Sequence, residues 1–80
     1  MRLDKWLKVS RIIKRRTVAK EVCDAGKIFI NDRPAKAGTE VKAGDELTLQ
    51  FGSRTMRVRV LATPDTISAD QAHTLYQELQ

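Results

Sequence analysis

The positively charged side chains of this 80-residue chain gather in its N-terminal part. Residues 1–36 contain eleven Lys or Arg and four Asp or Glu, a net charge of +7, whereas residues 37–80 contain four and six, a net charge of −2. Clustered cations bind phosphate groups well because they release condensed counterions and focus the electrostatic field. The sequence therefore predicts a single anion-binding face.

Arg15 and Arg16 are the strongest candidates for phosphate contacts. A guanidinium holds a phosphate through two parallel N–H donors, whereas a lysine supplies only a mobile point charge. Arg16 and Lys20 are four residues apart, so they share one helix face if the helix already includes Arg16. Thr17 can add its hydroxyl or a helix-start amide to the same phosphate.

A basic run of this kind is often only a solvated helix surface. Here Glu21 and Asp24 are too few to balance the neighbouring cations, which favours the binding interpretation. Asp4 would repel phosphate, so we expect it to act structurally, by orienting Arg11 or Arg16 through a salt bridge or by capping a helix.

Residue types that perform catalysis are sparse. His73 is the only histidine and Cys23 the only cysteine, so neither a metal cluster nor a nucleophile–histidine pair is supported. Asp45-Glu46 lies at a turn signal, and the four glycines are dispersed instead of forming a phosphate loop. We expect no enzyme activity, no metal and no cofactor, with Cys23 buried as a small core residue.

Hydrophobic periodicity predicts two helices at the N-terminus. In the first, Leu3, Trp6 and Leu7 share one face, so Trp6 is expected to pack in the core although it could stack on a base. Lys5 and Lys8 point away from that face.

The chain between the two helices, residues 9–16, fits either a loop or a helix extension. The second helix is expected to begin at Thr17 and to end at Gly26. Its apolar stripe is Val18, Ala19, Val22 and Cys23.

A small, mostly antiparallel sheet follows. Ile28 and Ile30 alternate with other residues before a turn at 31–34, and Gly44-Asp45 is a second turn signal. Residues 47–51 and 56–60 alternate around Gly52-Ser53 and predict a hairpin. Arg57 and Arg59 either extend the basic face or keep one face of the sheet wet.

The last part of the chain predicts a C-terminal helix. Ser68 to Gln71 has capping-box spacing, and Ala72, Leu75, Tyr76 and Leu79 fall at helical intervals. The fold class is thus α+β, with residues 1–64 as the main domain and 65–80 as a helical extension. No apolar run spans a bilayer and no signal peptide is apparent, so we expect a cytoplasmic protein.

Many spaced positions together resemble the S-four-type RNA-binding domain, over about residues 1 to 50. Arg15 stands where many members have Ser, and Asp32 replaces a common turn Gly. The matching residues are Arg2-Leu3-Asp4, Arg11, Arg16, Ala19, Val22, Gly26, Ile28, Ile30, Asn31 and Gly44-Asp45.

The resemblance implies that the two-helix face grips structured RNA. A protein reads A-form RNA mostly through its shape and backbone, because the base edges lie in a deep major groove. The RNA-binding residues implied in this way are Arg2, Lys5, Arg11, Lys14, Arg15, Arg16, Thr17, Lys20 and Lys27.

Among small stand-alone members, the sequence resembles the ribosome-associated quality-control P factors. That resemblance implies a monomer without a membrane partner that binds obstructed large ribosomal subunits through rRNA and peptidyl-tRNA. It would support a partner factor that directs C-terminal tailing of the stalled chain.

Three alternatives remain open from the sequence. The heat-shock protein fifteen type also binds obstructed large subunits, but its members are longer chains with a basic C-terminal extension. A general RNA chaperone would bind free structured RNA. A protein-interaction module would use Leu75, Tyr76 and Leu79 to recruit a partner, although core packing explains that stripe more simply.

Overall fold

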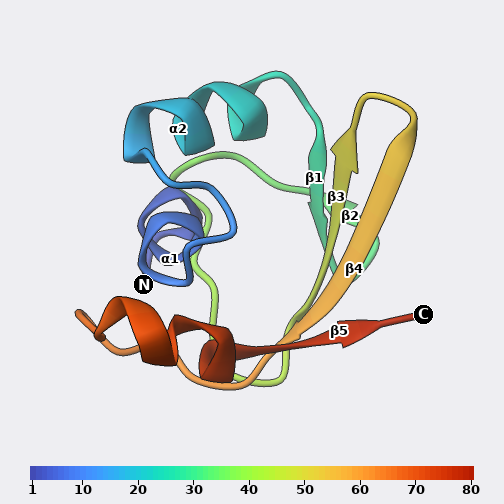
Figure 1. Ribbon diagram of the computed structural model, residues 1–80. Helices are drawn as coiled ribbons and strands as arrows, with labels where there is room; N and C mark the ends of the chain where they lie inside the picture. The colour runs from blue at the N-terminus through green and yellow to red at the C-terminus, as the bar shows by residue number, and fades with distance from the viewer.

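Helices cover one face of a five-stranded antiparallel sheet in the computed structural model, which describes residues 1–80 (Figure 1). The strand order is β2-β1-β3-β4-β5, and every neighbouring pair is antiparallel. The predicted α+β class is confirmed. The elements are α1 (Leu3–Val9), α2 (Arg16–Asp24), β1 (Ile28–Ile30), β2 (Arg33–Pro34), β3 (Glu46–Phe51), β4 (Arg54–Val60), a 3₁₀ helix (Ala69–Leu75) and β5 (Tyr76–Leu79).

Trp6 extends from α1 into the core, and its side chain is fully buried. Its ring meets Tyr76 edge-on, with centroids 6.3 Å apart, and its Nε1 donates a hydrogen bond to the Ala62 carbonyl at 2.9 Å. A buried indole needs such an acceptor for its N–H. The prediction that Trp6 packs in the core is confirmed.

The chain between the helices is a loop. Arg11 has φ +64°, the left-handed conformation that glycine usually supplies after a helix, and its amide donates to the Lys8 carbonyl. With arginine in this position the sequence carries no glycine stop signal. This explains why periodicity alone left residues 9–16 ambiguous.

The second helix differs in part from its prediction. It begins at Arg16 and not at Thr17, and Arg15 occupies the N-cap position with extended backbone. Ala19 and Cys23 are buried as expected, but Val18 is exposed, so its place in the apolar stripe was wrong. Gly26 adopts φ +77° just after the helix, which confirms the predicted stop.

Two turns set the register of the first strands. Asn31 and Asp32 both have positive φ, so they form the turn from β1 to β2 without glycine, as expected from the sequence. The Asn31 carboxamide donates to Asp45 at 3.2 Å and accepts from the Glu46 amide at 3.0 Å. The β1–β2 turn is thereby fixed to the Gly44-Asp45 turn that precedes β3.

The end of the chain forms a strand where a continuous helix was predicted. The 3₁₀ helix ends at Leu75, and β5 pairs with β4 through the register Val60–Tyr76. Ser68 makes no side-chain cap, so the predicted capping box does not form. The helical placement of Tyr76 and Leu79 was wrong because pairing with β4 outweighs a helix pattern of this length. The division at residue 64 stays a prediction.

None of the helices has the length and apolar composition needed to cross a bilayer.

Cys23 is fully buried, as predicted. Burial, with smaller contributions from the Asp4 and Asp24 carboxylates, raises the pKa of its thiol to about 11. Because the thiolate is the reactive form, we expect an alkylating reagent at pH 8 to modify folded Cys23 several-fold more slowly than Cys23 in denaturant. The raised pKa also means that the free energy of unfolding decreases as the pH rises from about 9 toward 11. Equal alkylation rates in both states would contradict this assignment.

Candidate RNA-binding surface

Asp4 connects the two helices through its carboxylate, which is almost fully buried. It accepts hydrogen bonds from Arg2 Nε at 3.1 Å, Arg2 Nη2 at 3.3 Å and Arg16 Nε at 3.4 Å. Both guanidinium groups remain about half exposed. A buried acid therefore orients two arginines at the surface, which confirms the predicted structural role and selects Arg16 over Arg11 as its partner.

The charge state of Asp4 follows from these contacts. Burial alone raises the pKa of its carboxyl group, but the hydrogen bonds from Arg2 and from the Lys5 amide, together with the charge of Arg16, outweigh it. The pKa is lowered overall, so Asp4 is ionised at neutral pH. With two arginines on one carboxylate, the cluster keeps a net positive charge of one.

The two helix starts differ in what they can offer an anion. At α1, the amides of Leu3 and Asp4 donate to the carbonyls of Thr39 and Ala37 at 2.9 and 3.1 Å. At α2, the first amides, those of residues 16–18, donate no hydrogen bond within the protein. A helix start with free amides favours phosphate oxygens, so Thr17 lies where its predicted contact requires.

Several of the predicted cations have no ion-pair partner in the protein. Three of them are paired: Arg2 and Arg16 contact Asp4, and the Lys5 ammonium group lies 3.3 Å from the Asp65 carboxylate. Unpaired side chains can meet phosphate without first breaking a salt bridge. Those that are exposed and unpaired are Arg11, Lys14, Arg15, Lys20 and Lys27.

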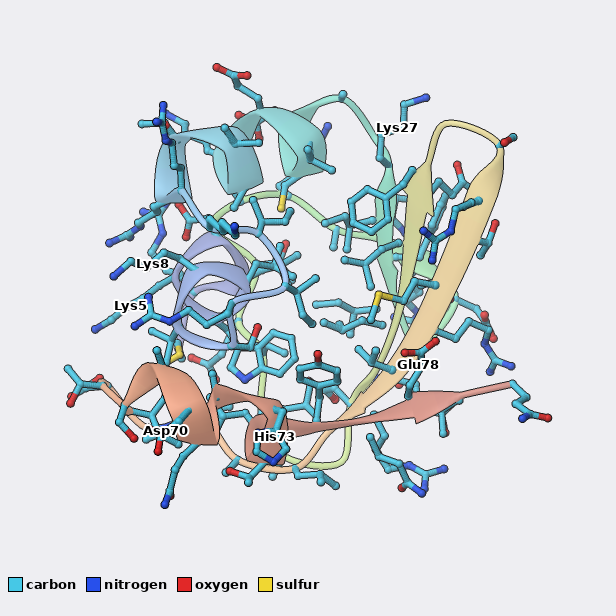
Figure 2. All side chains as sticks on the ribbon, viewed as in Figure 1. Lys5, Lys8, Lys27, Asp70, His73 and Glu78 are labelled. Carbon is cyan, nitrogen blue, oxygen red and sulfur yellow. The ribbon has the colours of Figure 1, made fainter.

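Lys8 was absent from the predicted set although its position favours it. It is exposed on α1, and in Figure 2 its side chain lies beside Lys5 on the side of α1 that faces away from the sheet. It lines a groove of about 250 Å³ with Arg11, opposite Asp65 and Thr66. Its spacing of three residues from Lys5 on a helix is the signal that could have found it.

Lys27 does not join the others. Figure 2 shows it beyond the end of α2, near the upper end of the sheet and far from Lys5 and Lys8. We therefore define the basic surface as the charged residues of α1, the loop that follows it and the first turns of α2, with Thr17. Its members are Arg2, Lys5, Lys8, Arg11, Lys14, Arg15, Arg16, Thr17 and Lys20.

Arg57 and Arg59 on β4 are paired instead of free. Arg57 and Arg59 contact the two carboxylate oxygens of Glu46 on β3, at 3.3 and 3.1 Å. Sharing one acid offsets part of their charge. Of the two interpretations of Arg57 and Arg59, the structure therefore favours polar side chains on a solvent-exposed face of the sheet over an extension of the basic surface.

Known proteins with a related sequence identify the fold family. A family model described as the S4 domain matches residues 1–47, more than half of the chain. Two curated proteins, both named RQC P-site tRNA stabilizing factor, are each 54% identical in sequence to this chain. The chain belongs to the S4 domain family, among these factors. The match to the protein of Halalkalibacterium halodurans spans 96% of this chain and 88% of the relative, and that to the protein of Bacillus subtilis spans 100% and 93%.

A solved structure confirms the fold of this S4 domain protein. Heat Shock Protein 15 of Vibrio cholerae, described as trimeric, superposes with a TM-score of 0.90 at 32% identity. The likeness covers 99% of this chain and 81% of that one. The family inferred from the sequence, with the more distant heat-shock type, is therefore confirmed.

Proposed function

We propose that this S4 domain protein binds large ribosomal subunits that carry peptidyl-tRNA, contacts their rRNA and tRNA, and stabilises the tRNA in the P site during ribosome-associated quality control. Family membership and the uneven charge support ribosome-associated RNA binding as the general function. The name shared by the 54%-identical relatives supports the P-site role. A partner factor on the same subunit would then direct C-terminal tailing.

The observation that best supports this proposal is the orientation of Arg2 and Arg16 by Asp4. Asp4 holds both guanidinium groups at the surface, so less side-chain entropy is lost when they bind phosphate. The free amides at the start of α2 lie next in sequence to Arg15 and Arg16. Oriented forks beside free amides fit a phosphodiester backbone of fixed shape, as A-form RNA presents.

In this proposal the chain acts by binding and performs no reaction. Its cations fix the tRNA and rRNA relative to each other, and the partner factor supplies the tailing activity. We propose that it does so as a monomer in the cytoplasm, with no cofactor.

Affinity purification from cells tests the proposal. The tagged protein is recovered gently, and its RNA and proteins are compared with those of an Arg15→Glu/Arg16→Glu variant. We expect large-subunit rRNA and tRNA with little small-subunit rRNA, and a strong loss of both RNAs in the variant because reversed charges repel phosphate. A Lys36→Glu/Lys42→Glu variant, which makes the same net change of charge at two exposed lysines outside the basic surface, is expected to recover more large-subunit rRNA than the Arg15→Glu/Arg16→Glu variant.

A different set of co-purified RNA or proteins would contradict the proposal and favour another function. Large subunits without tRNA would favour a subunit-recycling role of the heat-shock type, and assorted free RNA would favour a general chaperone. Proteins whose recovery is unaffected by the charge reversal, without rRNA, would favour a protein-interaction module.

A further inference from the structure

The tip of the β3–β4 hairpin carries an aromatic ring that does not pack in the core. Phe51 is 37% exposed and is the only aromatic residue exposed to this degree, since Trp6 is buried and Phe29 and Tyr76 are half-buried. It pairs with Arg54 in the last rung of the ladder, next to the turn at Gly52 and Ser53. The hairpin extends beyond the rest of the sheet (Figure 1).

The same hairpin is positively charged, although it lies in the acidic part of the sequence. Residues 47–64 contain three arginines and no Asp or Glu. Arg57 and Arg59 share Glu46, but Arg54 is exposed and has no ion-pair partner. A free cation thus lies directly across the ladder from the exposed ring.

Lys27 adds a second free cation at this end of the molecule. Its carbonyl accepts a hydrogen bond from the Gln50 amide at 2.9 Å, which places it opposite Gln50, so strand alternation directs it to the other face of the sheet from Phe51. Figure 2 shows Lys27 at the end of the sheet where the hairpin turns. Phe51 and Arg54, which pair directly across the ladder, therefore form one group, which we call the tip cluster.

The orientation of the tip cluster leaves the ring available. Leu49, two residues before Phe51, is fully buried, so both residues face the side of the sheet that the helices cover. Met56, diagonal to Phe51, packs against the core, but Phe51 lies past its edge. One face of the ring can therefore be covered by a ligand without unfolding any element.

We propose that the tip cluster is a second RNA contact, in which an unpaired nucleobase stacks on Phe51 while Arg54 holds an adjacent phosphate. This rests on the proposed function that the chain binds RNA. Aromatic side chains flanked by cations are the usual platform for single-stranded RNA, because every base offers a π-face and every linkage a charge. A protein partner would need a broader apolar patch than one ring beside a cation.

The tip cluster also differs from the basic surface in the part of the RNA that it would contact. RNA held by α1 and α2 would be contacted through its backbone, whereas RNA at the hairpin tip would be contacted through a base that has left its helix. The two contacts differ in what they require of the RNA. Only the second requires an unpaired nucleotide.

Two labelled RNA hairpins test this inference, one blunt and one with a short unpaired tail, titrated with the full-length protein. We expect Phe51→Ala to weaken binding of the tailed RNA by about fivefold or more and to leave binding of the blunt RNA unchanged. Phe51→Trp should retain the preference for the tail. Leu61→Ala removes a comparably exposed apolar side chain elsewhere and should change neither affinity.

Each result has a distinct consequence. If Phe51→Ala binds both RNAs like the unmodified protein, while Arg15→Glu/Arg16→Glu binds neither, the tip is not an RNA contact and the proposed function stands. If the unmodified protein binds neither RNA and recovers no ribosomal RNA from cells, the proposed function fails, and the tip contact with it.

Discussion

Replacing Trp6 with alanine is expected to lower the free energy of unfolding by about 3–5 kcal/mol. The indole is fully buried, so the substitution leaves a cavity in the middle of the core. It also removes the ring that meets Tyr76 and the donor bound to Ala62, two contacts that hold the C-terminal part of the chain against α1. For a domain of this size, such a loss is a large share of the total stability. Chemical denaturation followed by circular dichroism measures it.

A Trp6→Phe variant separates packing from hydrogen bonding. Phenylalanine keeps much of the apolar volume but cannot donate to the Ala62 carbonyl. We therefore expect a smaller loss in the free energy of unfolding, to which the missing hydrogen bond contributes about 1 kcal/mol. If Trp6→Phe were as unstable as Trp6→Ala, the hydrogen bond would dominate over packing. If Trp6→Ala unfolded at the same denaturant concentration as the unmodified protein, the central position of Trp6 would be contradicted.

The regular elements could be predicted because each carries its own periodic signal. Leu3, Trp6 and Leu7 repeat at helical spacing, and the β3 and β4 residues alternate on either side of Gly52-Ser53. Gly26 marked the end of α2 because a left-handed residue is needed there. Local patterns of this kind survive folding when the tertiary contacts agree with them.

The C-terminal strand could not be predicted in the same way. Ala72, Leu75 and Tyr76 do lie on a helical repeat, but the repeat ends where Leu61 donates its amide to the Leu75 carbonyl. From Tyr76 onward the backbone pairs with β4 and covers the edge that β4 would otherwise expose. A partner sixteen residues upstream, as Val60 is for Tyr76, leaves no signal in the local spacing.

The candidate site shows the same division. Charge clustering indicated the basic surface, and the pairing of Asp4 with Arg16 was among the expectations because an acid within a cationic group needs a partner. The distance of Lys27 from that surface and the exposure of Phe51 depend on how the strands end in space. Sequence spacing does not contain that information.

Asp4 provides the sharpest test of how the basic surface works. An acid among RNA-binding cations repels phosphate, so simple electrostatics predicts that Asp4→Asn strengthens RNA binding. The structure predicts the opposite, because a neutral amide cannot hold Arg2 and Arg16 with charge-assisted hydrogen bonds. We expect the affinity for the blunt RNA hairpin to fall by at least about tenfold, as two oriented guanidinium groups become mobile.

Asp65→Asn is the matched control for this prediction. Asp65 is also an acid paired with a cation of the basic surface, but its side chain is 88% exposed and its ion-pair partner is Lys5. Removing its charge frees Lys5 without disturbing an oriented arginine, so RNA binding should become slightly tighter. Weakening by Asp4→Asn together with strengthening by Asp65→Asn would show that orientation, and not net charge, sets affinity at Arg2 and Arg16. Strengthening by both substitutions would leave Asp4 as a source of repulsion alone.

Stability measurements across pH complete the test of Asp4. Its pKa is lowered in the folded protein, so its contribution to stability is present above its unfolded value of 3.8 and is lost as the pH falls through the folded value. We expect Asp4→Asn to lower the free energy of unfolding by about 2 kcal/mol at neutral pH, the scale of hydrogen bonds to a charged group. The difference from the unmodified protein should shrink in acid, where protonation removes the same interactions. A difference that persists undiminished in strong acid would mean that the side chain is important for its shape and not for its charge.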